Sequence, residues 1–323
     1  MIRTSEILFV KCVKDGIPNR DPLADSDARR LFGEDDGRIS LSDVSIKRDV
    51  RDYVLAKYPE GGEDQRHHIY IQELRRDKFL LGRKELAQWI FDRAGIANEL
   101  GDSLEQRRAA LARHAYDVRT FGAVYSVGDQ SFHLTGPTQF GWAHSLHAVE
   151  TRYVQGTVVI PSAESQGRSA GSGSREGKQQ GTIWSTYYLP FAVFAMPGIV
   201  NATIAQQTGM DASDVELLLE ALWRGTKFRQ ARGRGFQQPL LLIHVEYQDP
   251  LFRLGYLEEG IRLETTQPIP TGLDQVQLDV RALSDRLAAN AAHIARVRWW
   301  QDPELEVVGE LPGVAGGLEG PSA

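Results

Sequence analysis

The spacing of apolar residues divides the chain into expected strands and helices. Residues 6–13 (EILFVKCV) form a short apolar run rich in strand-forming residues, which predicts a first, buried strand. A second buried strand is expected over 240–245, and an alternating strand over 275–280. Helical spacing of apolar residues predicts a helix over 213–222, with Asp211 or Ser213 as N-cap, and another running from 284 toward 299.

The segment 37–57 (GRISLSDVSIKRDVRDYVLAK) sorts its side chains onto three faces of one predicted helix. Ser42 or Asp43 is the expected N-cap. At 100° per residue the faces are apolar (Ile46, Val50, Tyr53, Val54), cationic (Lys47, Arg48, Arg51) and acidic (Asp49, Asp52). An ordinary solvated face is the default interpretation for an isolated helix. A second basic segment elsewhere in the chain favours a binding role instead.

This second basic segment follows the helix expected over 213–222. No acidic residue lies between Glu220 and Glu246, while cations cluster around Gly233 and Gly235. The cations are Arg224, Lys227, Arg229, Arg232 and Arg234. Glycines let a backbone approach a ligand closely, and arginines neutralise phosphates. Because no counter-ion lies within the segment, we infer a polyanionic partner.

Other segments suggest additional units around these elements. Residues 58–115 contain charged helical stretches and are expected to form an inserted helical subdomain. Residues 116–126 return to strand-like sequence. The stretch 302–323 is rich in Gly, Pro and Glu, so we expect it to be disordered.

Two strand-like segments, 157–161 and 181–189, flank a Gly/Ser/Gln-rich stretch that carries Arg168, Arg175 and Lys178. This pattern predicts an extended hairpin with a mobile, mildly basic tip. Two catalytic motifs occur in the tip by chance. GRSAG lacks the strand and helix that a nucleophile elbow needs, and the phosphate-loop pattern around Lys178 fails at two positions. We reject both motifs.

Composition narrows the possible classes of protein. The 323 residues are 41% hydrophobic and 25% charged, as in a globular chain with a large core. No apolar run approaches the roughly 20 residues of a membrane span, and the N-terminus is unlike a signal peptide, so we expect a cytoplasmic protein without membrane contact. The single Cys12 excludes a disulfide framework and a cysteine-based zinc site. The net charge of -6 argues mildly against nucleic acid, although a local basic groove is compatible with it.

The loop 15–36 contains a cluster of carboxylates, including Asp21, Asp25 and Asp27, that could hold a divalent cation or act as general acid and base. Turn formation and solubility are the preferred explanation, because the spacing matches no EF-hand. His67, His68 and His114 show no spacing that points to a metal site, whereas His144 and His147, three residues apart, could ligate a metal only with further ligands, none of which the sequence indicates. The residues therefore predict no metal, no cofactor and no catalytic residue.

Several segments, in the same order, resemble the backbone subunit of type I CRISPR Cascade complexes (the "Cas-seven" family), most closely its I-B members. The segments lie within residues 5–260 and are NRDPLADSDARR, SDVSIKRDVRDYV, YDVRTFGAVYS, GPTQFGWAHSLHAVE and YYLPFAVFAMPGIVNATIAQQTG. The resemblance implies an α+β fold: a modified RNA-recognition-motif (ferredoxin-like) palm, a helical fingers insertion and a thumb hairpin. The implied boundaries are 1–57, 116–156 and 185–301 for the palm, 58–115 for the fingers, 157–184 for the thumb and 302–323 for the disordered tail.

The family implies a function as well. Such subunits polymerise along CRISPR RNA, grip its backbone and displace bases with the thumb, so that the intervening segments pair with target DNA. The implied partners are CRISPR RNA, target DNA through guide pairing, other copies of the chain and other Cascade subunits, in antiviral defence or guided transposition. The expected RNA contacts are Lys47, Arg48, Arg51, Arg229, Arg232, Gly233 and Arg234, together with Arg168, Arg175 and Lys178 in the thumb.

An alternative is a metal-dependent endoribonuclease. Related backbone subunits of type III complexes are thought to cut target RNA with an aspartate in the loop after the first strand, where this chain has Asp21, Asp25 and Asp27. The SDVSIKR form of the helix resembles type I members, which favours the non-catalytic role.

Overall fold

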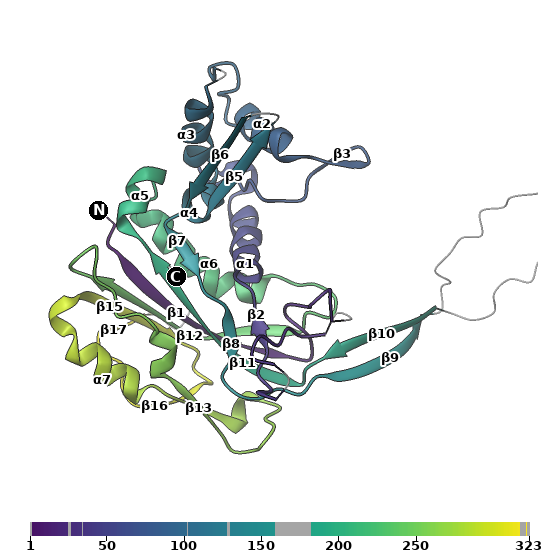
Figure 1. Cartoon of the computed structure of the whole chain (residues 1–323), viewed down its shortest axis with the longest axis vertical. Coiled ribbons are helices and arrows are strands. Elements are labelled where there is room, and N and C mark those ends of the chain that lie inside the picture. The colour runs from purple at the N-terminus through teal and green to yellow at the C-terminus, as the bar shows by residue number, and fades with distance from the viewer. Residues whose placement is uncertain are drawn as a thin grey trace, which may run out of the picture.

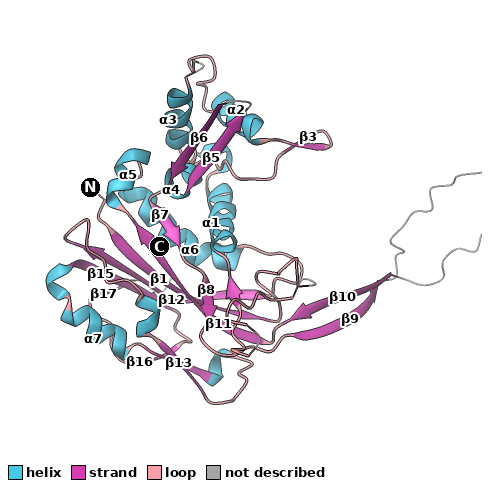
Figure 2. Cartoon of the chain, in the orientation of Figure 1, coloured by secondary structure: helices cyan, strands magenta, loops and turns pink. Residues whose placement is uncertain are grey.

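The computed structural model describes residues 2–24, 27–33, 35–101, 103–127, 130–158, 182–316 and 321. Its centre is a sheet with the strand order β17-β15-β12-β1-β11-β8-β2, in which β7 also pairs with β11 (Figure 1; Figure 2). All of these neighbours are antiparallel except β15 and β17. The strands are β1 Ser5–Lys14, β2 Ser40–Leu41, β7 Thr138–Phe140, β8 Ala143–Ser145, β11 Phe191–Val200, β12 Phe236–Tyr247, β15 Ile294–Gln301 and β17 Val314–Ala315.

Strand β1 lies at the middle of this sheet and is covered on both faces. All ten of its residues pair with β11 and with β12. Ile7, Phe9 and Val13 pack into one hydrophobic cluster, whereas Leu8 and Val10 pack into another on the opposite face. A strand buried on both faces reads as a continuous apolar run, so the first predicted strand is confirmed.

Helices α1 Asp43–Lys57, α5 Ala202–Thr208 and α6 Ala212–Phe228 contribute to the first cluster. The apolar face predicted for α1 is buried, with Tyr53 partly exposed, and α6 buries Val215, Leu218, Leu219 and Leu222. The Asp211 carboxylate accepts hydrogen bonds from the backbone N–H groups of Ser213 and Asp214, which confirms the predicted cap. The two long helices pack closely because residue 225 is glycine: a Cβ there would lie 2.8 Å from the Asp49 carbonyl oxygen.

The opposite face of the sheet carries a smaller sheet, β13 Arg262–Thr265, β14 Val276–Asp279 and β16 Glu306–Val308, with helix α7 Arg281–Ala289. The predicted strand at 275–280 is thus confirmed. Short 3-10 turns connect these elements: η2 Leu257–Gly260, η3 Leu273–Gln275 and η4 Ala291–His293.

Two predictions for the C-terminal part are wrong. The expected helix from 284 toward 299 ends at Ala289, and residues 294–301 form β15 because their backbone pairs with β12. The expected disorder over 302–323 does not hold for 302–316, where β16 pairs with β14 and β17 pairs with β15. Residues 302–316 show little apolar pattern of their own, and backbone pairing with β14 and β15 orders them.

A third cluster forms a separate subdomain, at the top of Figure 1. Its elements are η1 Pro59–Gly61, β3 Arg75–Arg76, β4 Phe79–Leu80, α2 Arg83–Arg93, α3 Leu104–His114, α4 Tyr116–Phe121, β5 Gly122–Val127 and β6 Gln130–Thr135. Helices α2 and α3 confirm the helical stretches expected within 58–115. Residues 116–121 are helical rather than extended, and the cluster includes Tyr125, Phe132 and Leu134, which lie beyond the predicted boundary at residue 115.

A two-stranded hairpin, β9 Arg152–Val158 and β10 Thr182–Tyr188, projects from the body (Figure 1). All seven residues of each strand pair antiparallel, so the described ladder agrees with the predicted hairpin and begins earlier than residue 157. Its expected tip, including Arg168, Arg175 and Lys178, lies outside the described residues. Within the described part of the chain, no helix is long and apolar enough to cross a membrane.

Candidate nucleic-acid interface

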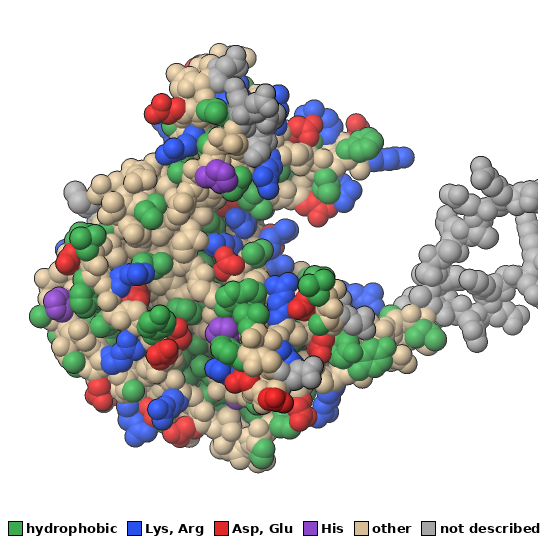
Figure 3. Space-filling model, viewed as in Figure 1, with side chains coloured by type: hydrophobic (Ala, Val, Ile, Leu, Met, Phe, Trp, Pro, Cys, Tyr) green, Lys and Arg blue, Asp and Glu red, His purple; other side chains and the backbone are tan. Residues whose placement is uncertain are grey.

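A cleft of about 420 Å³ lies where helix α1, the loop after β1 and the loop before β12 meet. Its described lining contains six arginines and no acidic residue; the arginines are Arg20, Arg48, Arg51, Arg229, Arg232 and Arg234. We call it the arginine cleft. The arginines come from three segments that are far apart in sequence, and five of them are among the expected RNA contacts. Figure 3 shows Lys and Arg side chains gathered in a hollow on this side of the molecule, between the top subdomain and the β9–β10 hairpin.

Helix α1 supplies two of these arginines in different environments. Arg48 is exposed, and its Nε donates to Asp52 Oδ1 at 2.6 Å. Arg51 is 8% exposed, and its Nε donates to Asp117 Oδ2 at 2.8 Å. Such a paired, buried guanidinium orders the floor of the cleft, whereas the exposed Arg48 is available to a ligand.

The loop 229–235 lies opposite α1 and takes its shape from two glycines. Gly233 and Gly235 have φ of 72° and 75°, which disfavours other residues. A Cβ on Gly235 would lie 2.5 Å from the Lys14 carbonyl oxygen, and one on Gly233 would lie 2.5 Å from Arg20 Nη2. Gly233 therefore allows a close approach within the protein and is not itself part of the cleft lining.

The basic segment has a counter-ion from outside itself, so the expectation that its charge is uncompensated is wrong. Asp49 of α1 is fully buried, and its Oδ1 accepts from Arg229 at 2.8 Å and from Arg234 at 2.6 Å. Lys11 on β1 lies 3.4 Å from Asp49 Oδ2. The acidic face of the helix does not point to solvent at this position, because the loop and β1 close over it.

Burial of the side chains around Asp49 lowers the pKa values of Lys11 and Arg234. Burial lowers the pKa of Lys11 to about 8, although the Asp49 carboxylate acts in the opposite direction. Burial also lowers the pKa of Arg234, which is 5% exposed. Both pKa shifts mean that burying these two positive charges around Asp49 costs electrostatic free energy.

Arg20 is not among the expected RNA contacts, because its loop was interpreted from its acidic residues alone. Its guanidinium donates to the Gly233 carbonyl at 3.1 Å and to the Tyr187 carbonyl at 3.5 Å, so it links the glycine loop to the base of β10. The Arg232 guanidinium lies 5.5 Å from the centroid of the Trp184 ring on the same strand. Arg232 is exposed and lines the cleft, and no ion pair of its guanidinium is found among the described residues.

Lys47 is not brought into the arginine cleft. Its Nζ donates to Asp43 Oδ2 at 2.8 Å and to Gln139 Oε1 at 3.3 Å, and it lies over the Phe121 ring. No structural finding tests the binding role of any of the expected contacts, and these roles stay predictions.

The carboxylates of the loop after β1 serve local structure. Asp21 Oδ1 accepts from the backbone of Leu23, and the two Asp27 oxygens accept from Ala28 N and Thr151 Oγ1. Asp25 lies outside the described residues. Where the chain is described, no group of three His, Cys, Asp or Glu residues could hold a metal ion. The ribonuclease hypothesis is untested.

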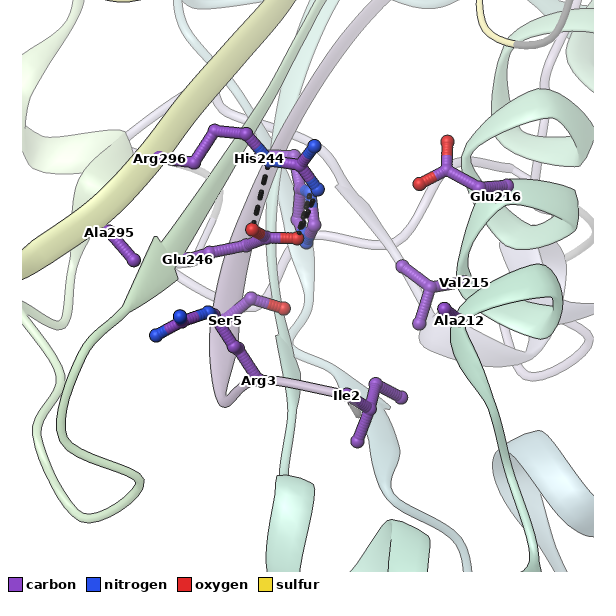
Figure 4. A pocket seen from close by; sticks show the side chains of 10 residues that line it. All are labelled: Ile2, Arg3, Ser5, Ala212, Val215, Glu216, His244, Glu246, Ala295 and Arg296. Atoms are coloured by element: carbon purple, nitrogen blue, oxygen red, sulfur yellow. Dashed lines mark hydrogen bonds and ion pairs between the residues drawn. The ribbon is translucent and has the colours of Figure 1, made fainter.

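A second cavity of about 350 Å³ lies between the sheet and the N-terminal end of α6, and its lining includes Arg3, Glu216, Glu246 and Arg296 (Figure 4). Arg296 on β15 pairs with Glu246 on the neighbouring strand β12, and His244, which is 1% exposed, also lines this cavity. His244 Nδ1 lies 3.1 Å from Arg298 Nη2 and accepts its hydrogen bond. Burial, followed by the positive charge of Arg298, lowers the pKa of His244 to about 3.

His244 should make stability depend on pH. Its folded-state pKa lies below the ordinary value of 6.5, so its contribution is fully present above pH 6.5 and is lost as the pH falls toward 3. His244→Asn keeps an acceptor for Arg298 but does not titrate. We expect the free energy of unfolding of this variant, measured by urea denaturation, to fall less steeply between pH 6 and pH 4, by up to about 1.4 kcal/mol per pH unit. An unchanged slope would contradict the assignment.

Comparisons with known proteins identify the family of this chain. The model of the family "CRISPR-associated protein Cas7" matches residues 3–281. A CRISPR-associated protein Cas7 of Haloferax volcanii is 28% identical over 95% of this chain and 89% of that protein. A chain of a solved CRISPR RNA-guided surveillance complex in a pre-nicking state has a TM-score of 0.53 at 14% identity, covering 95% of this chain and 96% of the other. The last similarity supports the mixed α+β fold. On the family match, which spans most of the sequence, this chain belongs to the CRISPR-associated protein Cas7 family.

Proposed function

We propose that this chain is a non-catalytic backbone subunit of a type I CRISPR Cascade complex, of the I-B subtype, that coats guide RNA. The observation that carries the proposal is the arginine cleft, whose described lining has six arginines and no carboxylate. Arginine contacts to phosphates bind RNA without regard to sequence. That property suits a subunit that repeats along one guide and leaves sequence recognition to base pairing.

The architecture supports specific assignments. We assign the central sheet with α1 and α6 as the modified RNA-recognition-motif palm, the third-cluster subdomain as the fingers and β9–β10 as the base of the thumb. The contacts from Arg20 to the Tyr187 carbonyl and from Arg232 to Trp184 support a cleft and a thumb that act together on one RNA strand. The proposed partners are guide RNA, target DNA paired with it, further copies of the chain and other Cascade subunits, in antiviral defence or guided transposition.

The test is to express the chain with a matching CRISPR array, with and without the other Cascade subunits. We expect a large assembly in size-exclusion chromatography, a high ratio of absorbance at 260 nm to that at 280 nm, and extracted RNA of one discrete length. A chain that stays free of nucleic acid even with its partner subunits would contradict the proposal. Metal-dependent cutting of complementary RNA that is lost in Asp21→Ala or Asp27→Ala would support the ribonuclease instead.

A further inference from the structure

A small arm, residues 71–82, leaves the third-cluster subdomain and exposes apolar side chains at its tip. It consists of β3 and β4, two residues each, joined by a turn in which Asp77 has a φ of 56°. All four strand residues are exposed, and Phe79 and Leu80 are 79% and 57% exposed. An exposed aromatic residue beside an exposed leucine at the end of a projecting hairpin suggests a surface that meets a partner.

The root of this arm is firmly held. The Asp117 carboxylate accepts hydrogen bonds from the backbone of Tyr70 at 2.8 Å and of Ile71 at 3.1 Å, and it also pairs with Arg51 of the arginine cleft. At the other side of the root, Leu81 N donates to the Leu74 carbonyl at 2.9 Å. The arm is therefore positioned relative to the cleft by one buried carboxylate, and the exposure of its tip is not a consequence of fraying.

The arm adjoins the arginine cleft and carries positive charge of its own. Ile71, at its root, is part of the cleft lining. Arg76 and Lys78 lie close to Phe79 in sequence, and among the described residues neither makes an ion pair, whereas Arg75 pairs with Glu73. In Figure 3 the arm projects above the hollow where Lys and Arg side chains gather, and the β9–β10 hairpin projects below it.

We propose that the β3–β4 arm is a second nucleic-acid contact, in which Phe79 stacks on a base of a single-stranded segment leaving the arginine cleft while Arg76 and Lys78 contact its phosphates. Proteins that bind single strands without sequence preference combine aromatic side chains, on which bases stack, with cationic side chains that contact the phosphates. Arg76 and Lys78, for which the described part of the chain shows no ion pair, and the continuity of the arm with the cleft favour nucleic acid over a protein partner at this tip. The inference rests on the proposed function, and the single strand is either the guide RNA or the target strand.

The test measures RNA affinity and base stacking with the full chain and a guide-length RNA carrying 2-aminopurine at successive positions. We expect Phe79→Ala to weaken binding about fivefold or more, and Phe79→Trp to preserve it. In the wild-type complex, 2-aminopurine fluorescence at particular positions should be quenched, and Phe79→Ala should restore it. Replacing Arg76 and Lys78 with alanine should reduce the slope of log affinity against log salt by about 1.4. Tyr256→Ala, which removes another exposed aromatic ring that is not part of the cleft lining, should change nothing.

Adding the complementary DNA strand distinguishes a contact with the guide RNA from a contact with the target strand. A Phe79 effect already seen with RNA alone assigns the contact to the guide, and one seen only after the DNA is added assigns it to the target strand. Unchanged affinity and fluorescence in Phe79→Ala under both conditions would overturn the proposal. So would a smaller assembly in Phe79→Ala with unchanged RNA affinity per chain, because the arm would then bind protein. If cleft variants also leave RNA binding intact, the proposed function itself fails.

Discussion

Replacing Arg48 and Arg232 together with alanine is expected to weaken RNA binding on the order of 25-fold at about 0.1 M salt. Both side chains are exposed in the arginine cleft; Arg48 pairs with Asp52, and Arg232 contacts the Trp184 ring. Each lost single-strand phosphate contact reduces the slope of log affinity against log salt by about 0.7, so the double variant should lose about 1.4. Filter binding of RNAs of different sequence across a salt series measures both quantities, and the loss should be similar for every sequence.

Lys47→Ala is the matched control, because Lys47 lies on the same helix but outside the cleft. Its slope should stay that of the wild type. A slope unchanged in the double variant would remove the cleft from the RNA path. A loss in Lys47→Ala equal to that in the arginine variants would mean that the whole cationic face of α1 binds, as its sequence suggested.

Replacing Asp49 with asparagine is expected to lower the free energy of unfolding by about 3–5 kcal/mol. The carboxylate lies against Lys11, Arg229 and Arg234, and removing its charge leaves several cations crowded together with little access to water. Breaking a buried pair costs more than the pair contributed, because the remaining charge stays desolvated. Urea unfolding followed by intrinsic fluorescence measures the change.

Asp52→Asn is the corresponding control on the same helix. Asp52 pairs with Arg48 and Arg229 near the surface, and pairs of this kind contribute less than about 1 kcal/mol. Equal destabilisation in the two variants would contradict the special position of Asp49. If Asp49→Asn stays fully stable, another group must neutralise Lys11 and Arg234.

Much of the fold could be predicted from residue patterns because local backbone conformation and burial leave a periodic signal. The apolar run of β1, the buried stripe of α1 and the Asp211 cap of α6 were all predicted correctly for this reason. The strand β15 was not, since Ile294 and Val297 also fit a helical period and only pairing with β12 decides between the two conformations. The same holds for β16 and β17 in the expected disordered tail.

The candidate site, like the fold, could be predicted from the sequence only in part. The sequence by itself determined that two basic segments exist, on a helix near residue 48 and around two glycines near residue 234, and that a hairpin lies between them in the chain. Only the tertiary structure decided that Arg20 joins these two segments in the cleft and that Lys47 lies outside it. It also decided that Arg234 and Arg51 are buried, each in an ion pair with an aspartate. The physical reason is that the energy of a charge depends on distance and burial. Asp49 neutralises an arginine 185 residues away, and no periodicity along the chain carries that information.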